Sequence, residues 1–437
     1  MSSLIKSSIL TFFTQNIVFI VNLATSVVIA RLLGPSGKGT YALITLIPSM
    51  LTMLAILGME ESNVYFTANK KWDMNQVVSN SISCAFCFSA VVILLFWFIS
   101  KTHFYNAFIE SNGINNVYVW AVVMILPFAL IKRYLIQVLR GREQIAKYNL
   151  LLLSGASFFL VFIILFLLVL RKGVAGAILS YILRAISIMG LAVWVVREVS
   201  PIRFDFNLGL FKASVRYGSK VYLGRLAQFF NYRLDMFIAA YFLNTSAVGY
   251  YSLAVGLVEK VWMIPSAIRV GLFPRIARIK LDEADKLTPL ACRYTFLLLF
   301  LTLLSLGVAG KPIIRFLYGE AYLPSFRPLI ILLPGILVFG LCKVIMTDCL
   351  GRGKSEVGTI AAAISLVMNI PLNLIFIPKW GISGAAFSTT ISYILASGVI
   401  IAIFLKYSGS KLSELLCIKP NDIKMIYRYC SLKIMRD

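Results

Sequence analysis

The chain of 437 residues is 59% hydrophobic and only 14% charged, with a mean hydropathy of +0.87. This composition excludes an ordinary soluble protein and predicts one that crosses a membrane many times. Its 42 Lys and Arg residues outnumber 18 Asp and Glu, for a net charge of +24, which fits nucleic acid, an anionic membrane surface or an anionic substrate. We expect no nucleic acid partner, because the basic residues lie in short loops between apolar runs.

Apolar runs long enough to cross a hydrocarbon core of about 30 Å as helices occur along almost the whole chain. They predict an all-α integral membrane protein with about 12 transmembrane helices. The first run is too long for a cleavable signal and is expected to remain as the first span. The runs cover residues 10–31, 40–60, 78–100, 117–139, 148–170, 173–196, 217–243, 249–273, 291–309, 325–347, 357–377 and 381–405.

Basic residues also predict the orientation of the spans. If the N-terminus is cytoplasmic, the connections on its side carry most of the loop Lys and Arg residues, which is the distribution of cytoplasmic loops. Both termini are therefore predicted to be cytoplasmic. The basic tail is expected to contact anionic lipid.

An internal repeat divides the chain. The segment ARLLGPSGKGTYAL from Ala30 matches AYFLNTSAVGYYSL from Ala240, and GVAGAILS from Gly173 matches GISGAAFS from Gly381. Matches in the same order at a nearly constant offset predict two pseudo-symmetric six-helix bundles around a central cavity, related by an axis along the membrane normal. The predicted parts are an N-terminal lobe at 1–200, an interfacial connector at 201–216, a C-terminal lobe at 217–405 and a cytoplasmic tail at 406–437.

The seventh span carries a polar stripe, which is unusual for a helix that faces lipid. An ionised side chain near the bilayer centre costs about 2.5–3.5 kcal/mol, so the stripe is expected to face protein or water. We interpret it as one wall of a hydrated, cationic cavity. Its polar members are Lys220, Gln228, Asn231 and Asp235, with Arg225 and Tyr232 beside them.

Four cations lie deep in their predicted spans: Arg184, Arg225, Arg233 and Lys260. Asp235 and Glu259 lie at similar depth, which leaves a positive surplus suited to a pyrophosphate group. Purely internal ion pairs remain an alternative, and Arg233 is the weakest candidate because it points away from Asp235. Either acid could carry a proton that couples transport to an ion gradient, or could serve as a static ion-pair partner for Arg225 or Lys260.

For the cations near the cytoplasmic ends of spans, a structural role is expected. Lys132 and Arg133 are predicted to extend to the membrane interface. Glu60 and Glu61 are predicted to be solvated. The only histidine, His103, falls in an outer loop, and the seven cysteines lack metal-ligand spacing, so neither a metal, a cofactor nor a catalytic triad is expected.

The segment after the first span and RLDMFIAAYFLNTSAVGYYSLAVGL from Arg233 resemble the paired signatures of the bacterial polysaccharide flippases. These are the O-antigen-type (Wzx) exporters of the multidrug/oligosaccharidyl-lipid/polysaccharide superfamily, and the resemblance covers about Leu10 to Leu405. It implies translocation of an undecaprenyl-pyrophosphate-linked oligosaccharide, an O-antigen or capsule repeat unit, across the bacterial inner membrane. It also implies alternating access with ion coupling, and a polysaccharide polymerase and chain-length regulator as candidate partners besides membrane lipids. Asp235 and its RLD neighbours match the family.

Two alternatives are weighed against this resemblance. A multidrug exporter of the same superfamily would favour acids and aromatic rings around cationic drugs, which the basic surplus disfavours. A membrane glycan polymerase or ligase would need a sizeable outer loop with catalytic groups, and the longest outer connections are short and poor in acids. We therefore expect a transporter rather than an enzyme.

Overall fold

The computed structural model describes residues 2–200, 203–276, 278–279, 281–354 and 356–417. All regular secondary structure in this part of the chain is helical, which confirms the predicted all-α membrane class. The chain divides into two compact units, one reaching to Ser252 together with Ile314–Leu323 and the other made of Leu253–Ile313 and the chain from Pro324 onward. The predicted lobe boundaries at 200 and 216 stay a prediction, and residues 418–437 of the predicted tail, with Pro201 and Ile202 of the connector, lie outside the described residues.

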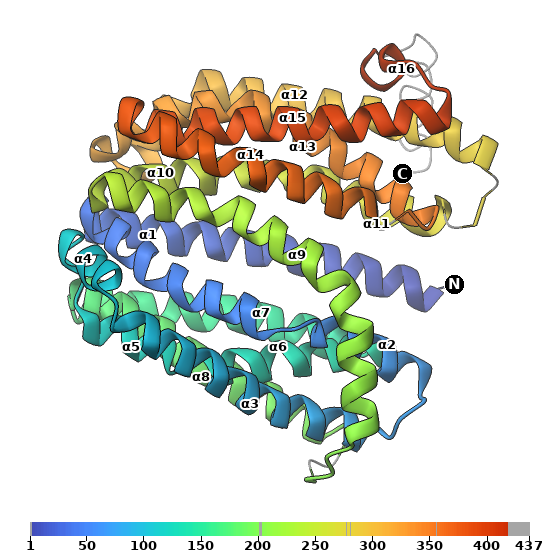
Figure 1. Cartoon of the computed structure of the whole chain (residues 1–437), viewed down its shortest axis with the longest axis horizontal. Coiled ribbons are helices and arrows are strands. Elements are labelled where there is room, and N and C mark those ends of the chain that lie inside the picture. The colour runs from blue at the N-terminus through green and yellow to red at the C-terminus, as the bar shows by residue number, and fades with distance from the viewer. Residues whose placement is uncertain (1, 201–202, 277, 280, 355, 418–437) are drawn as a thin grey trace, which may run out of the picture. The chain divides into compact units, whose positions relative to one another are not determined.

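Besides Ile314–Leu323, which holds the end of one later helix and part of another, the first unit contains ten helical segments and the start of an eleventh. They are α1 (Ser2–Ala55), α2 (Met59–Asn69), α3 (Met74–Ser100), α4 (His103–Ser111), α5 (Asn116–Val123), α6 (Leu126–Gly141), α7 (Ile145–Ile163), η1 (Ile164–Val169), α8 (Gly173–Arg197), α9 (Leu208–Phe242) and the beginning of α10 (Thr245–Val258). In Figure 1, α3, α6 and α8 run alongside one another within this unit, and buried side chains from them form a continuous apolar core.

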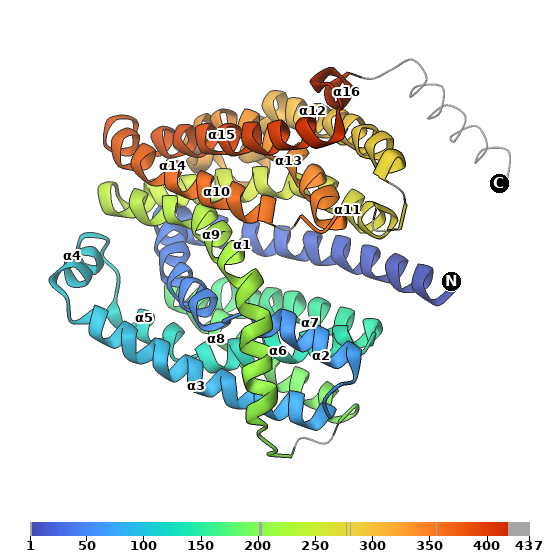
Figure 2. The same cartoon turned by 45° about the vertical axis from the view of Figure 1, so that its right-hand side comes forward.

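The second unit is built from the remaining helices. They are η2 (Glu259–Trp262), α11 (Met263–Ile276), most of α12 (Leu281–Tyr318), the end of η3 (Glu320–Ser325), α13 (Phe326–Gly351), α14 (Glu356–Trp380), α15 (Ile382–Ser408) and α16 (Leu412–Leu416). Figures 1 and 2 both show α15 beside α13 and α14, and α15 packs extensively against both of these helices.

Nine helical stretches of the described chain are long and apolar enough to span a membrane. One of them, α1, contains two crossing segments, because Gly34 (φ 67°, ψ 179°) interrupts the helix just before Pro35. The predicted seventh span is α9, whose polar residues lower its hydropathy. The predicted eighth span is divided among α10, η2 and α11 at Glu259–Trp262. Each of the twelve predicted runs thus corresponds to helical structure.

The second span is broken, which the continuous run at 40–60 did not predict. Between α1 and α2, Leu57 (φ 45°) and Gly58 (φ 76°) adopt left-handed backbone conformations. The carbonyl groups released at the break accept hydrogen bonds from two tyrosines. Tyr134 of α6 donates to the Ala55 and Ile56 carbonyls (3.3 and 3.2 Å), and Tyr222 of α9 donates to Leu54 (3.0 Å). Such partners are required at membrane depth, since an unpaired carbonyl in an apolar interior is costly.

Local backbone geometry repeats between the two halves of the sequence. Arg142 after α6 and Arg352 after α13 have nearly identical dihedral angles (φ −84°, ψ 3° and φ −87°, ψ 6°), and each is followed by a residue with positive φ. Gly173 and Gly381, which open α8 and α15, have φ values of 56° and 58°. Arg142 and Arg352 are therefore equivalent positions of the repeat, 210 residues apart.

A reciprocal glycine contact joins the two copies of the repeated signature within the first unit. A Cβ atom added to Gly39 would overlap the carbonyl oxygen of Thr245, and one added to Gly249 would overlap the carbonyl oxygen of Pro35. Gly39 and Gly249, like Pro35 and Thr245, are equivalent positions of the repeat. The two backbone segments therefore approach more closely here than they could if any residue other than glycine stood at these two positions.

Candidate functional site

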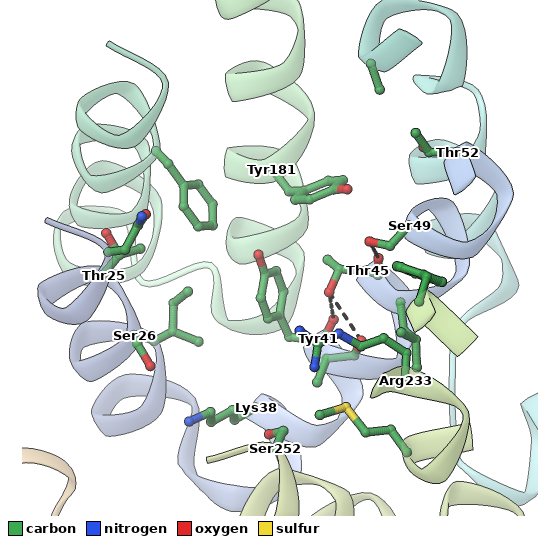
Figure 3. A pocket seen from close by; sticks show the side chains of 18 of the residues that line it. Thr25, Ser26, Lys38, Tyr41, Thr45, Ser49, Thr52, Tyr181, Arg233 and Ser252 are labelled. Atoms are coloured by element: carbon green, nitrogen blue, oxygen red, sulfur yellow. Dashed lines mark hydrogen bonds between the residues drawn. The ribbon is translucent and has the colours of Figure 1, made fainter. Parts of the chain in front are cut away.

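A polar cavity of about 600 Å³ lies within the first unit. Its walls come from both halves of α1 and from α6, α7, α8, α9 and the start of α10. Figure 3 shows Thr25 and Ser26 on one half of α1 and Ser49 and Thr52 on the other, with Tyr181 of α8 between them. The reversal of the chain at Gly34 places the two halves of α1 on either side of the same space.

Hydroxyl groups of the second half of α1 make one wall polar. Thr45 donates to the Tyr41 carbonyl (2.8 Å), Ser49 to Thr45 (2.8 Å) and Thr52 to Pro48 (2.6 Å). These bonds to the preceding turn satisfy the hydroxyl protons, while the oxygen atoms can still accept. Tyr41, Thr45, Ser49 and Thr52 follow one another at steps of four, four and three. This helical spacing was a usable signal that our sequence analysis missed.

The cavity is lined by four cationic side chains, Lys38, Lys132, Arg133 and Arg233, and its described wall residues include no carboxylate. Lys38 also lies over the rings of Tyr318 and Tyr322, at 5.2 and 5.4 Å. A polar chamber with this charge is suited to an anion, because arginine and lysine form charge-assisted hydrogen bonds to phosphate oxygens.

The four predicted deep cations have different surroundings. Arg233 lines the cavity, and the Arg184 guanidinium lies 5.0 Å from the ring of Phe159, a wall residue. Arg225 is not a wall residue and is ion-paired with Glu60 (3.1 Å) and with Glu61. Lys260 belongs to η2 of the second unit. The structure therefore brings Arg233 into the cavity wall, places Arg184 against a wall residue, and places Arg225 in an ion-pair network.

Lys132 and Arg133 both line the cavity, a role that their depth in the span did not predict. The expectation that Glu60 and Glu61 are solvated was wrong. Glu60 is only 6% exposed, and its carboxylate accepts from Arg133 Nε (2.6 Å) and from Arg225. Sequence depth could not reveal this pairing, since the partners come from α6 and α9.

The predicted acids and polar residues of α9 lie in several environments. Asp235 is 2% exposed, and it accepts from the Tyr251 hydroxyl (2.5 Å) and from the backbone N–H of Met236. Gln228 donates to the hydroxyl of Tyr232 (2.9 Å), and Asn231 is buried. Glu259 lies beside Lys260 in η2. The side chain of Lys220 lies outside the described part of the structure.

The fold and the cavity define the class of the protein: a multi-pass, all-α membrane protein with a polar chamber lined by cations. The chain belongs to the polysaccharide biosynthesis protein family, whose model matches residues 28–327.

Known proteins with similar sequences or structures agree with this class. The protein described as "Putative O-antigen transporter" of Shigella flexneri is 24% identical over 410 residues, covering 90% of this chain and 96% of that protein. The lipid II flippase MurJ in an inward closed conformation aligns with a TM-score of 0.76 at 16% identity, over 98% of this chain and 93% of MurJ. An inward-facing transporter of the MATE family of the MOP superfamily aligns with a TM-score of 0.73 at 14% identity, over 92% and 98%.

Proposed function

We propose that this protein is a flippase that moves an undecaprenyl-pyrophosphate-linked oligosaccharide, an O-antigen or capsule repeat unit, across the membrane. The observation that carries the proposal is the cavity itself, whose described wall residues include the four cations Lys38, Lys132, Arg133 and Arg233. Membership of the polysaccharide biosynthesis family, the O-antigen transporter relative and the MurJ-like fold support it.

The chemistry of such a cargo matches the parts of the site. A pyrophosphate brings negative charge and several acceptor oxygens, which cationic side chains bind strongly in a low-dielectric setting. The sugar hydroxyls would exchange hydrogen bonds with the hydroxyl wall of α1 and with water. The polyprenyl tail would remain in lipid, because its transfer into a polar chamber is unfavourable.

The finer features of the proposal follow from the sequence. We place the protein in the bacterial inner membrane with both termini cytoplasmic, working by alternating access as a transporter and not as an enzyme. Asp235 or Glu259 would provide ion coupling or counter-charge, and Lys260 would add to the anion site during the cycle. A polysaccharide polymerase and a chain-length regulator are proposed as partners.

Neutralising two wall cations tests the proposal. We expect the double variant Lys132→Met/Arg233→Gln to lower the initial rate of lipid-linked oligosaccharide flipping in reconstituted vesicles by at least roughly tenfold, since each lost charge-assisted bond is worth about 1.5–3 kcal/mol. The control is Arg140→Gln, an exposed cation on the same helix as Lys132. Unchanged flipping by the double variant at equal protein level would contradict the proposal.

A multidrug exporter remains the second candidate, because MATE transporters share the fold. The absence of carboxylates from the described cavity wall argues against cationic drugs as cargo. Accumulation of a cationic dye in cells with and without the protein separates the two functions: a drug exporter lowers accumulation, and a flippase leaves it unchanged.

A further inference from the structure

Glu60 connects the cavity to a helix contact outside it. It lies in the first turn of α2, where a carboxylate also interacts favourably with the helix dipole. One oxygen accepts from Nε of Arg133, which lines the cavity, at 2.6 Å. The other accepts from Arg225 of α9 at 3.1 Å. A single buried carboxylate is thus shared between a cation of the site and a cation of a neighbouring helix.

The α2–α9 contact that Arg225 joins is tightly packed. The backbones of Gly58 and Gly218 are so close that a Cβ atom on either would overlap the other residue. Two turns along α2 from Gly58, Tyr65 stacks on Tyr217, the neighbour of Gly218, with ring centroids 4.3 Å apart and an interplanar angle of 19°. Figure 2 shows α9 passing across α2 at this place.

An anion in the cavity would change the partners of Glu60. Arg133 can form only a limited set of directed hydrogen bonds, and a pyrophosphate carries more negative charge than a carboxylate. When Arg133 binds the anion instead, the buried Glu60 carboxylate loses one of its two arginine partners, which is unfavourable for a buried charge. Its remaining partner is Arg225, so the attraction between α2 and α9 increases.

We propose that Glu60 is a positioning residue that couples anion binding in the cavity to the α2–α9 contact. In the empty cavity Glu60 divides its charge between Arg133 and Arg225. In the loaded cavity Arg133 binds the anion. Glu60 then pairs with Arg225 alone, and this stronger attraction moves α9 closer to α2. The contact therefore tightens when cargo is present. This inference rests on the proposed function and adds to it the step by which the protein detects its cargo.

The test uses purified full-length protein in nanodiscs, with inorganic pyrophosphate as the probe. Native cysteines are replaced by serine, and Tyr65→Cys with Tyr217→Cys reports the contact through the rate of disulfide formation. We expect saturating pyrophosphate to raise this rate at least roughly fivefold, the lower end of usual coupling between sites.

Three variants give the test its specificity. Glu60→Gln should bind pyrophosphate at least as tightly by calorimetry and show no change in the disulfide rate. Glu61→Gln is the matched control: the Glu61 carboxylate is ion-paired with Arg225, whereas Arg133 Nε donates to Glu60, so this variant should keep the response. Arg133→Gln should show the faster rate without pyrophosphate, because Glu60 then has only Arg225.

A Glu60→Gln protein that keeps the response, or an Arg133→Gln protein that keeps the slow rate, would overturn the coupling role. Either result would leave the proposed function intact as long as the unaltered protein binds pyrophosphate and flips its cargo. An unaltered protein that neither binds pyrophosphate nor flips lipid-linked oligosaccharide would overturn the proposed function itself.

Discussion

Single residues control how closely the helices of the first unit approach. We expect Gly39→Ala to lower the stability of the purified protein by at least about 2 kcal/mol, because the new methyl group would overlap the Thr245 carbonyl and force two backbones apart. Thermal unfolding in detergent measures the loss.

The matched control is Gly190→Ala in α8, where no atom lies within 4 Å of the added Cβ. It should be neutral, or stabilising by up to about 1 kcal/mol through helix propensity. Equal unfolding temperatures for the Gly39 and Gly190 variants would show that the close approach has no energetic role.

Among single residues, the charged ones show that the depth of a residue along a predicted span does not reveal its surroundings. Its position in the sequence makes Arg233 the weakest of the predicted site cations, yet it lines the cavity. Lys132 and Arg133 are predicted to be interfacial, and they line the cavity too. Depth along a span can be counted in residues, but the direction of a side chain and its ion-pair partners depend on which helices pack beside it.

Between helices, a buried carboxylate joins three elements of the second unit. Asp348 of α13 is fully buried and accepts from Thr288 of α12 (2.7 Å), Tyr407 of α15 (2.7 Å) and Arg352 (3.1 Å). We expect Asp348→Asn to destabilise the protein by about 3 kcal/mol or more, since the Arg352 charge loses its buried partner.

Asp285→Asn is the control for that variant. Asp285 accepts from the same Arg352 at 2.8 Å, but its side chain is partly exposed. Its loss should cost no more than about 1 kcal/mol, because solvent screens the pair. Unfolding temperatures that rank the two variants in the opposite order would contradict this account of the second unit.

For the elements themselves, continuous hydrophobicity predicted where helical structure lies but not where a helix breaks. It located helical structure for every predicted span, but it did not foresee the break at Leu57 and Gly58. Ile56 and Leu57 are apolar, so periodicity contains no signal there. The break persists because Tyr134 and Tyr222, which are distant in sequence, supply the missing hydrogen-bond donors.

For the whole molecule, the distribution of basic residues predicts the orientation in the membrane. Alkaline phosphatase fused to the C-terminus should be inactive, because it folds only outside the cytoplasm, and a fluorescent protein at the same site should be bright. The matched fusion after Asn112, in a predicted outer connection, should show the reverse pattern. An active C-terminal phosphatase would contradict cytoplasmic termini.

The membrane class and the helical architecture follow from the sequence alone, because they depend on how apolar residues are distributed along one chain, and the internal repeat follows from matching residues at a nearly constant offset. Only the tertiary structure decided which polar groups meet: the hydroxyl wall of α1, the four cations of the cavity, and Glu60 between Arg133 and Arg225. The physical reason is that hydrophobic burial acts on every residue of a span, whereas a hydrogen bond or an ion pair depends on the positions of two particular side chains.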